Sequence, residues 1–344
     1  MIRVRPIREE DFPVLMRIAE ESGPGFTSLP AARDLLEAKI GRSLQAMGTD
    51  ISTPGDHGYL FMMEESRNGE VIGTTGIEAA VGMRDPWYHY RIGTIVHASR
   101  ELAIHNQFQT LYLCNDYTGH SEVCTLYLLP RYRRDGNGTL LSKCRFLFMA
   151  QHLHRFAPRV IAEMRGVSDE RGRNPFWEGL GRHFFTMEFS KADFLTGIGN
   201  KAFIAELMPK HSIYIHLLPP DAQAVIGEVH AHTRPARRML EDEGFHFEGY
   251  VDIFDGGPTL VCRTADVRSI RHSRLLTSAA LRRASPTVHC LVSNTHLEGF
   301  RCILAPVALE AERVLLTAEQ TDALELTAGA PVRVVPLQQT RKSH

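Results

Sequence analysis

The order of apolar and polar positions at the start of the chain predicts one strand followed by two helices. Ile2–Arg5 alternates between apolar and charged residues, as a half-buried strand does. The segments 8–21 and 30–44 instead place their apolar residues at helical spacing, with glycines and prolines between them at 23–25. We therefore expect a strand and two amphipathic helices that cover a sheet.

A β-hairpin is predicted next. The apolar segments 59–64 and 71–80 flank Arg67-Asn68-Gly69, and Asn-Gly readily takes the backbone conformation of a tight hairpin turn. The aromatic segment Gly82–Glu101 predicts a packed loop with one further strand at Arg91–His97, while the alternative is an insertion that shapes a substrate pocket.

The strongest local pattern runs from Cys124 to Met149 and predicts a strand, a turn and a helix. Cys124–Leu129 is mostly apolar with β-branched and aromatic members, which is typical of a buried strand, and Pro130 ends it. The turn Arg133–Gly138 contains two arginines and two glycines, and the apolar residues of Thr139–Met149 then recur at helical spacing. A helix that starts beside glycines leaves its first N–H groups free, so this turn predicts a site for a phosphate or pyrophosphate.

The spacing of the turn distinguishes among phosphate sites. It matches neither the P-loop nor the dinucleotide-binding glycine pattern. Arg133-x-x-Gly136-x-Gly138 instead resembles the loop of the GNAT superfamily of acyl-CoA N-acyltransferases. In that family the loop holds the pyrophosphate of CoA, and the backbone of the preceding strand binds the pantetheine arm. The alternative is an ordinary surface turn, but the predicted strand and helix on either side favour the CoA site.

Beyond the central helix, the pattern predicts further strands and helices of the same unit. Asn174–Phe185 resembles the next helix and strand of the superfamily, but the region lacks the tyrosine that protonates the leaving thiolate in many members. Val267–Arg283 is basic and predicts a solvated helix that runs into a linker. The other predicted strands are 159–164, 245–253 and 259–262, and the other predicted helices are 221–230 and 236–243.

The C-terminal residues predict a separate small β unit. Val288–Val292, Arg301–Pro306 and Val332–Leu337 are strand-like, and Ala318–Leu326 is helical. Their pattern is similar to double-psi barrels, and we expect the unit to serve packing or subunit contact. The predicted fold is therefore an α/β (α+β) mixed sheet flanked by helices, with an acyltransferase domain at 1–280 and a small β domain at 285–344. Within the first domain, we expect about 1–200 to bind CoA and about 201–280 to be a continuation that carries His230.

Composition narrows the function without defining it. The 344 residues carry a net charge of −1, which argues against a nucleic-acid-binding protein, and no apolar run approaches the length of a membrane helix. The N-terminus does not have the pattern of a signal peptide, and the six cysteines form no C-x-x-C pair, as expected for a cytoplasmic protein with reduced thiols.

The histidines near residue 230 are the best candidates for proton transfer, because imidazole titrates near neutral pH. His230 and His232 follow a predicted helix in His-Ala-His-Thr. A structural histidine at a helix end is the alternative. A metal site built on His-x-His lacks a third ligand at a suitable spacing, so we expect no metal.

Several longer segments match those of one family and narrow the resemblance from the superfamily to that family, the bacterial arginine N-succinyltransferases. The resemblance covers essentially the whole chain. The segments that carry it are 25–30, Asp85–Tyr88, Val96–Ser99, Ala162–Val167, 201–211, Val225–His230 and Asp252–Leu260. This family has a histidine followed by proline where the chain has His230-Ala231, so the role of His232 stays open.

The resemblance implies both the reaction and the site. Succinyl-CoA, as co-substrate, would transfer its succinyl group to the α-amine of L-arginine, with no permanently bound cofactor. By the same resemblance, His230 would be the proton donor and Leu126 a CoA contact. The remaining residues predicted to bind CoA are Leu128, Arg133, Arg134, Gly136, Asn137 and Gly138.

Several questions stay open at this stage. Asp116, Glu163 and Asp255 are candidates for binding the substrate guanidinium. Alternative functions are an acyl-CoA N-acyltransferase that acts on ornithine or another amine, and a CoA-binding subunit without catalytic activity. We expect small-molecule partners and an oligomer, with neither nucleic acid nor membrane as a partner.

Overall fold

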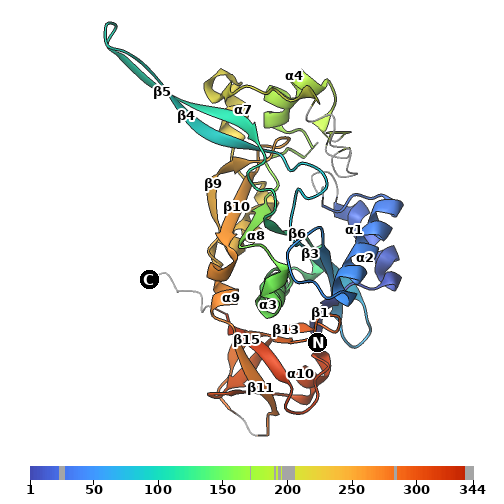
Figure 1. Cartoon of the computed structure of the whole chain (residues 1–344). Coiled ribbons are helices and arrows are strands. Elements are labelled where there is room, and N and C mark those ends of the chain that lie inside the picture. Colours follow the sequence, from blue (N-terminus) through green and yellow to red (C-terminus); the bar gives the residue numbers. More distant parts are fainter. Residues whose placement is uncertain are drawn as a thin grey trace.

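The computed structural model describes residues 1–22, 28–170, 172–189, 191–192, 195, 206–282 and 285–337. The family segments at 25–30 and 201–211 lie partly outside the described residues. One extended sheet organises the described chain, in the order β12-β15-β11-β14-β13-β1-β2-β3-β6-β7-β10-β9-β4-β5-β8. The predicted fold class, a mixed sheet flanked by helices with a small C-terminal barrel, is confirmed (Figure 1).

The element bounds largely follow the predicted segments. The strands before the barrel are β1 (Ile2–Pro6), β2 (Gly58–Glu65), β3 (Val71–Glu78), β4 (His89–Ser99), β5 (Ile104–Cys114), β6 (Ser121–Leu128), β7 (Arg159–Glu163), β8 (Ile213–Tyr214), β9 (His246–Val251) and β10 (Pro258–Arg263). The helices are α1 (Phe12–Ser22), α2 (Arg33–Gly48), α3 (Asn137–Gln151), α4 (Arg182–Phe185), α7 (Pro220–Val225), α8 (Arg234–Glu241), α9 (Arg268–Arg271) and α10 (Ala318–Ala323).

The middle of the sheet is covered on both faces, which explains why β2 reads as a continuous apolar run. Leu60 and Met62 pack in one cluster with residues of α1 and α2. Phe61 and Met63, which alternate with them, pack in a second cluster with α3, where the rings of Phe61 and Phe148 lie 5.0 Å apart. α3 is buried on nearly all sides because it contacts the sheet, α9 and the barrel strands β12 and β13.

Five strands close the C-terminal barrel. They are β11 (Arg274–Ala280), β12 (Val288–Asn294), β13 (Cys302–Leu309), β14 (Arg313–Leu316) and β15 (Pro331–Pro336). Their order β12-β15-β11-β14-β13 is closed by pairing of β12 with β13. The predicted solvated helix at 267–283 is therefore wrong: within 267–282, the described part of that range, only Arg268–Arg271 is helical, and Arg274–Ala280 is a barrel strand that places Leu276 in the barrel core. We accordingly propose that the barrel unit begins near residue 274.

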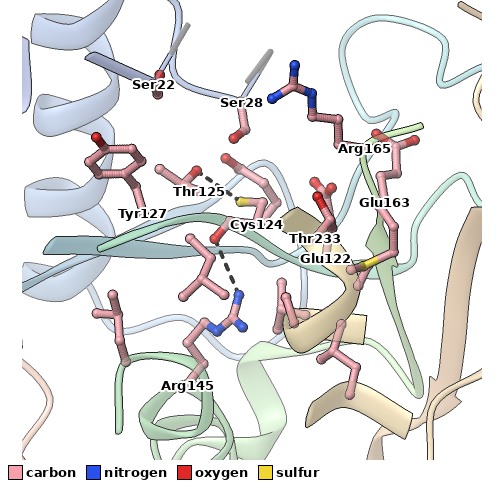
Figure 2. Close-up of a pocket in the computed structure, with 18 of the residues that line it drawn as sticks. Ser22, Ser28, Glu122, Cys124, Thr125, Tyr127, Arg145, Glu163, Arg165 and Thr233 are labelled. Atoms are coloured by element: carbon pink, nitrogen blue, oxygen red, sulfur yellow. Dashed lines mark hydrogen bonds between the residues drawn. The ribbon is translucent and has the colours of Figure 1, made fainter. Parts of the chain in front are cut away.

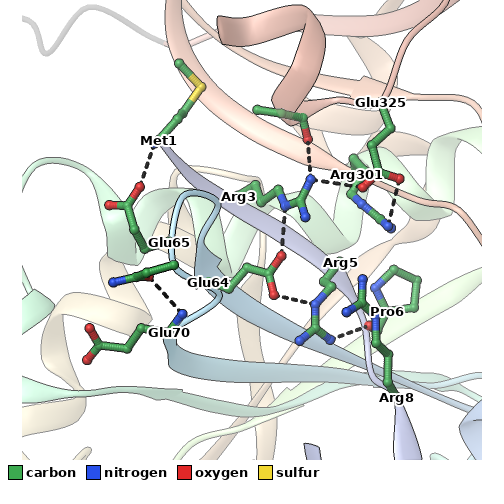
Figure 3. Close-up of polar contacts among 12 residues, drawn as sticks. Met1, Arg3, Arg5, Pro6, Arg8, Glu64, Glu65, Glu70, Arg301 and Glu325 are labelled. Atoms are coloured by element: carbon green, nitrogen blue, oxygen red, sulfur yellow. Dashed lines mark hydrogen bonds and ion pairs between the residues drawn. The ribbon is translucent and has the colours of Figure 1, made fainter. Parts of the chain in front are cut away.

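β1 joins the barrel to the main sheet, since it pairs with β2 on one side and with β13 on the other. Figure 3 shows the charged contacts at this junction. Both Glu64 oxygens accept hydrogen bonds, from Nε of Arg3 at 2.8 Å and from Nε of Arg5 at 2.5 Å, and Asp11 pairs with both terminal nitrogens of Arg5. Burial alone would raise the pKa of Glu64, but the hydrogen bonds and charge of Arg5 outweigh it and lower the pKa.

On the other side of the sheet, the structure differs from the sequence-based predictions in two places. The segment 104–114, for which no strand was predicted, forms β5, and β5 pairs with β4 along its full length from His89↔Cys114 to Ser99↔Ile104. The two strands project from the body as an arm (Figure 1). The described residues 172–189 contain no strand near Phe185, where one was expected: Trp177–Gly181 is a π-helix that continues into α4. Trp177 lies buried there and stacks on Phe185, which stabilises the helical turn.

Among the described residues, no helix has the length and apolar character needed to cross a membrane.

Candidate active site

A cavity of about 1580 Å³ opens where β6 and β7 separate. These two strands are parallel but pair only at Ser121↔Val160 and Glu122↔Ile161. Beyond Glu122 they diverge, and Cys124 and Leu126 of β6 line the cavity. In the part of the chain that the structure describes, the edge of β6 that faces β7 is therefore unpaired over most of its length, so backbone N–H and C=O groups on this edge can bind a ligand.

A β-bulge gives β6 its shape at the cavity. Thr125 has φ +55°, which is unusual for a β-branched residue and costs about 1–3 kcal/mol. On β6, three residue steps separate Cys124 from Tyr127, whereas their partners on β3, Gly76 and Thr74, are two steps apart. Gly76 lies opposite the bulge, and a Cβ there would make a tight contact of 3.3 Å with Thr125 Oγ1.

Arg145 stabilises the bulge from the face of the sheet that α3 covers. Its guanidinium is buried, and Nη1 donates to the Cys124 carbonyl at 3.3 Å (Figure 2). Its Nε donates to the Ser142 carbonyl at 2.9 Å. Burial lowers the pKa of Arg145 to about 10, which leaves it charged at neutral pH. The sequence does not single out this contact, because Arg145 lies close to Ser142 and Lys143 and is one of several polar residues in this part of α3.

The loop after β6 leads into the N-terminus of α3, as predicted. Gly136 has φ +78° and is the N-cap of α3, and Nε of Arg133 donates to the Leu128 carbonyl at 2.9 Å. Among the described residues, no acceptor is found for the backbone N–H groups of Gly138 and Thr139, which line the cavity. These N–H groups lie at the positive end of a helix dipole, which favours an anion.

The structure brings most of the predicted CoA-binding residues to this one cavity. Asn137 is the exception: it is buried, its N–H donates to the Arg134 carbonyl at 3.0 Å, and its side chain donates to the Tyr132 carbonyl at 3.1 Å. Its interactions position the turn. The predicted residues that line the cavity are Leu126, Leu128, Arg133, Arg134, Gly136 and Gly138.

His230 lies beside the cavity wall. Its N–H donates to the Arg165 carbonyl at 2.9 Å, and its ring lies 5.0 Å from that of His232, which lines the cavity. Nδ1 accepts the N–H of His232 at 3.2 Å. Burial, followed by the charges of Arg165 and His232, lowers the pKa of His230. A neutral ring with Nδ1 as acceptor carries its proton on Nε2.

Carboxylates gather where β6 and β7 meet. Glu122, Glu163 and Asp252 all line the cavity, and Glu163 Oε1 lies 2.9 Å from Nε2 of the buried His89. Burial and then the charge of Glu163 raise the pKa of Asp252. Such a cluster favours a bound cation, because a positive charge would relieve the repulsion between the carboxylates.

Three carboxylates were candidates from the sequence, those of Asp116, Glu163 and Asp255. Of these, only Glu163 both belongs to this cluster and can contact a substrate in the cavity. Asp255 lines the cavity as well, but its oxygens accept the backbone N–H groups of Gly166 and Gly257 at 2.6 and 2.7 Å. Asp116 accepts the Tyr250 hydroxyl at 2.8 Å and does not line the cavity. Among the described residues, no group of three or more potential metal ligands was found.

Comparisons with known proteins agree with this geometry. Residues 2–269 match the family described as arginine N-succinyltransferase beta subunit, and residues 274–336 match the C-terminal domain of that family. The chain is 53% identical to an arginine N-succinyltransferase of Enterobacter sp. (strain 638) over 338 residues, or 98% of each chain. It is 52% identical to one of Salmonella schwarzengrund over 335 residues, or 97% of each chain.

A solved structure covers nearly the same length. The arginine/ornithine succinyltransferase subunit AI from Pseudomonas aeruginosa is 37% identical to the chain, with a TM-score of 0.91, and the match covers 98% of this chain and 99% of that one.

Proposed function

Because the chain belongs to the arginine N-succinyltransferase family and is an acyltransferase, we propose that it transfers the succinyl group of succinyl-CoA to the α-amine of L-arginine. The products would be N2-succinylarginine and CoA. Succinyl-CoA would be a co-substrate that enters and leaves with each turnover. The main observation behind the proposal is that one cavity connects the unpaired edge of β6 with the free N–H groups at the start of α3.

This cavity has the two parts that a thioester carrier needs. We expect the CoA pyrophosphate to bind the N–H groups of Gly138 and Thr139, with Arg133 and Arg134 supplying positive charge. The pantetheine arm would follow the free edge of β6, beside Leu126 and Leu128. Its thioester would then lie between the diverging strands, where a backbone N–H of β6 can stabilise the tetrahedral oxyanion.

His230 would act on the departing sulfur. Since its pKa is lowered and Nδ1 accepts a backbone N–H, the ring is expected to be neutral at pH 7 with Nε2–H as its donor. A neutral imidazole is a weak acid, so we expect it to hydrogen-bond the sulfur as negative charge develops there. The attacking amine loses a proton in the same reaction, which balances the proton gained by the thiolate. No covalent enzyme intermediate is required.

Turnover assays with purified protein test this function. At matched succinyl-CoA, kcat/KM should be higher for arginine than for ornithine, because a guanidinium can pair with a carboxylate through two parallel hydrogen bonds and an ammonium cannot. A preference for ornithine would support the second candidate, which the name of the Pseudomonas aeruginosa protein also includes. CoA binding without turnover by the purified chain would instead indicate a non-catalytic subunit.

We propose that Glu163 binds the substrate guanidinium. Glu163→Gln should raise KM for arginine about 10- to 100-fold, because a charge-assisted hydrogen bond contributes about 1.5–3 kcal/mol. The dissociation constant for CoA should stay within a few-fold, since the CoA loop lies at the other end of the cavity. Steady-state kinetics and calorimetry measure both. An unchanged KM for arginine would exclude Glu163 from substrate binding.

We also propose that the arm formed by β4 and β5 contacts a second subunit. Between residues 92 and 109 these strands pair only with each other among the described residues, and an isolated two-stranded hairpin is marginally stable in water. The arm nevertheless exposes apolar side chains, with Val96 49%, Leu102 70% and Ile104 43% exposed. Apolar groups exposed on a projecting hairpin are typical of a surface that a partner covers.

The double variant Leu102→Glu/Ile104→Glu should therefore shift the protein from oligomer to monomer. Two charges would have to be buried at the interface, which is strongly unfavourable. Sedimentation velocity measures the mass of each species. Gln107→Glu is the matched control, because it adds a charge at an exposed polar position of the same arm. A wild-type protein that sediments as a monomer at micromolar concentration would contradict the proposal.

A further inference from the structure

Most of the cationic side chains that line the cavity are already neutralised by carboxylates. Lys39 and Arg42 both pair with Glu78, at 3.1 and 2.6 Å, and Arg84 pairs with Asp56. Arg134 lies 3.6 Å from its neighbour Asp135. Among the described residues, the lysines and arginines of the cavity wall that form no ion pair are Arg133, Arg145 and Arg165.

Two of these three arginines already have a role, one in the CoA loop and one beneath the bulge of β6. Arg133 belongs to the CoA loop, where its Nε is fixed by the Leu128 carbonyl. Arg145 is buried under β6 and uses its donors on the Cys124 and Ser142 carbonyls. Arg165 is different: its one hydrogen bond from the guanidinium to a described residue is a long one, from Nη2 to Ser168 Oγ at 3.3 Å. Most of its five N–H donors are therefore available.

The backbone that carries Arg165 is firmly held. Its carbonyl accepts the N–H of His230 at 2.9 Å, and the N–H of Gly166 donates to Asp255 Oδ2 at 2.6 Å. Gly166 has no room for a side chain, since a Cβ there would lie 2.4 Å from the Asp255 carbonyl oxygen. Figure 2 shows the Arg165 side chain reaching from the end of β7 toward Ser28, beside Glu163. A cation on a fixed backbone thus lies in the cavity beside Glu163, with its guanidinium directed toward Ser28.

The proposed substrates bring two carboxylates to this end of the cavity, the terminal carboxylate of the succinyl group and the α-carboxylate of arginine. Either anion would enter beside Glu122, Glu163 and Asp252, where an unpaired negative charge is unfavourable. On the basis of the proposed function, we infer that Arg165 binds a substrate carboxylate there through a two-point ion pair. Arg165 would then be a specificity-determining residue for substrates that carry this group.

Substrate analogues that lack one carboxylate each distinguish the two sources. Acetyl-CoA lacks the terminal carboxylate of succinyl-CoA, and agmatine lacks the α-carboxylate of arginine. In Arg165→Gln, the kcat/KM ratio of succinyl-CoA to acetyl-CoA should fall about 10- to 100-fold if the succinyl carboxylate is bound. If the α-carboxylate is bound, the ratio of arginine to agmatine should fall by that factor instead. Arg165→Lys should give a smaller loss in the same ratio, because it keeps the charge without the fork.

Comparing kcat/KM ratios cancels any effect of a substitution that is the same for a substrate and its analogue. The loss of the Arg165 charge will also raise the pKa of His230, but that change acts equally on each substrate and its analogue. Arg84→Gln is the matched control, because Arg84 lines the same cavity and is paired with Asp56. Both ratios should be unchanged in it. Where an analogue turns over too slowly to measure, dissociation constants for the same pairs give the ratios.

The outcomes separate this inference from the proposed function. Absence of wild-type turnover with succinyl-CoA and arginine would overturn the function and the inference together. Normal wild-type turnover combined with unchanged ratios in Arg165→Gln would overturn the role of Arg165 alone.

Discussion

Replacing His230 by alanine should lower kcat roughly 10²- to 10³-fold, the range found when one hydrogen-bond donor to a developing negative charge is removed. The dissociation constant for succinyl-CoA should stay nearly the same. His230 lies beside Arg165 and His232, which line the cavity, and is well separated in the chain from the loop that would hold the nucleotide. Release of the CoA thiol, followed spectrophotometrically, gives kcat, and calorimetry gives the binding constant.

Two further variants separate chemistry from local structure. The His230 ring also stabilises the turn at Ala231–Thr233 by accepting the His232 N–H, and alanine removes that acceptor. His230→Asn keeps an acceptor at the same position and lacks the Nε2–H, so it should lose as much activity as alanine does. His232→Ala tests the neighbouring ring. Near-normal turnover of both His230 variants would remove His230 from the mechanism, and a loss confined to His232→Ala would transfer the role to His232.

The pH dependence of kcat tests the protonation state of His230. Its pKa is lowered, so the ring is neutral above that pKa, and the contribution of Nε2–H should stay constant from about pH 7 to about pH 9. As the pH falls through the pKa, a proton on Nδ1 would face the N–H of His232, and kcat should fall. An imidazolium acid predicts the opposite sign, with kcat falling as the pH rises. His230→Asn should lack the acid limb.

The strand, turn and helix of the candidate site were predictable because their signals are local. Cys124–Leu129 is mostly apolar, Pro130 ends the strand, and the glycines mark the turn before α3. The bulge at Thr125 was not predictable in the same way, because threonine is an ordinary strand residue. Its conformation depends on β3, a strand distant in sequence, and on Arg145 beneath it.

Of the strands that were not predicted, β5 and β11 were missed for different physical reasons. β5 begins with Ile104-His105-Asn106-Gln107, which is exposed on both faces of the arm, so burial imposes no alternation on it. β11 contains Arg274-Leu275-Leu276, whose charges and leucines suit a helix in isolation, and it is a strand because it pairs with β14 and β15. Arg165 was not identified either, because a single arginine after a strand has no distinctive sequence pattern. It stands out only in the structure, where it lines the cavity and forms no ion pair with a described residue.

Gly138→Asp should weaken binding of succinyl-CoA roughly 100-fold or more and leave the fold intact. Gly138 is the second residue of α3, lines the cavity, and has no atom within 4 Å of the position that a Cβ would take. An aspartate fits there and favours the helix, since a negative charge near a helix N-terminus is stabilising by about 0.3–1 kcal/mol. The melting temperature should therefore not fall. The same carboxylate would repel the pyrophosphate, because like charges about 4 Å apart near a protein surface repel by about 4 kcal/mol.

Gly138→Asn is the matched control, since it adds a side chain of the same size without the charge. Calorimetric titration of both variants with succinyl-CoA separates the two effects. A large difference between aspartate and asparagine would mean that negative charge, rather than bulk, prevents binding, as expected if phosphate oxygens contact the start of α3. If Gly138→Asp binds succinyl-CoA as tightly as the wild type, the nucleotide must lie elsewhere. The orientation of the thioester between β6 and β7, and with it the mechanism proposed for His230, would then have no support.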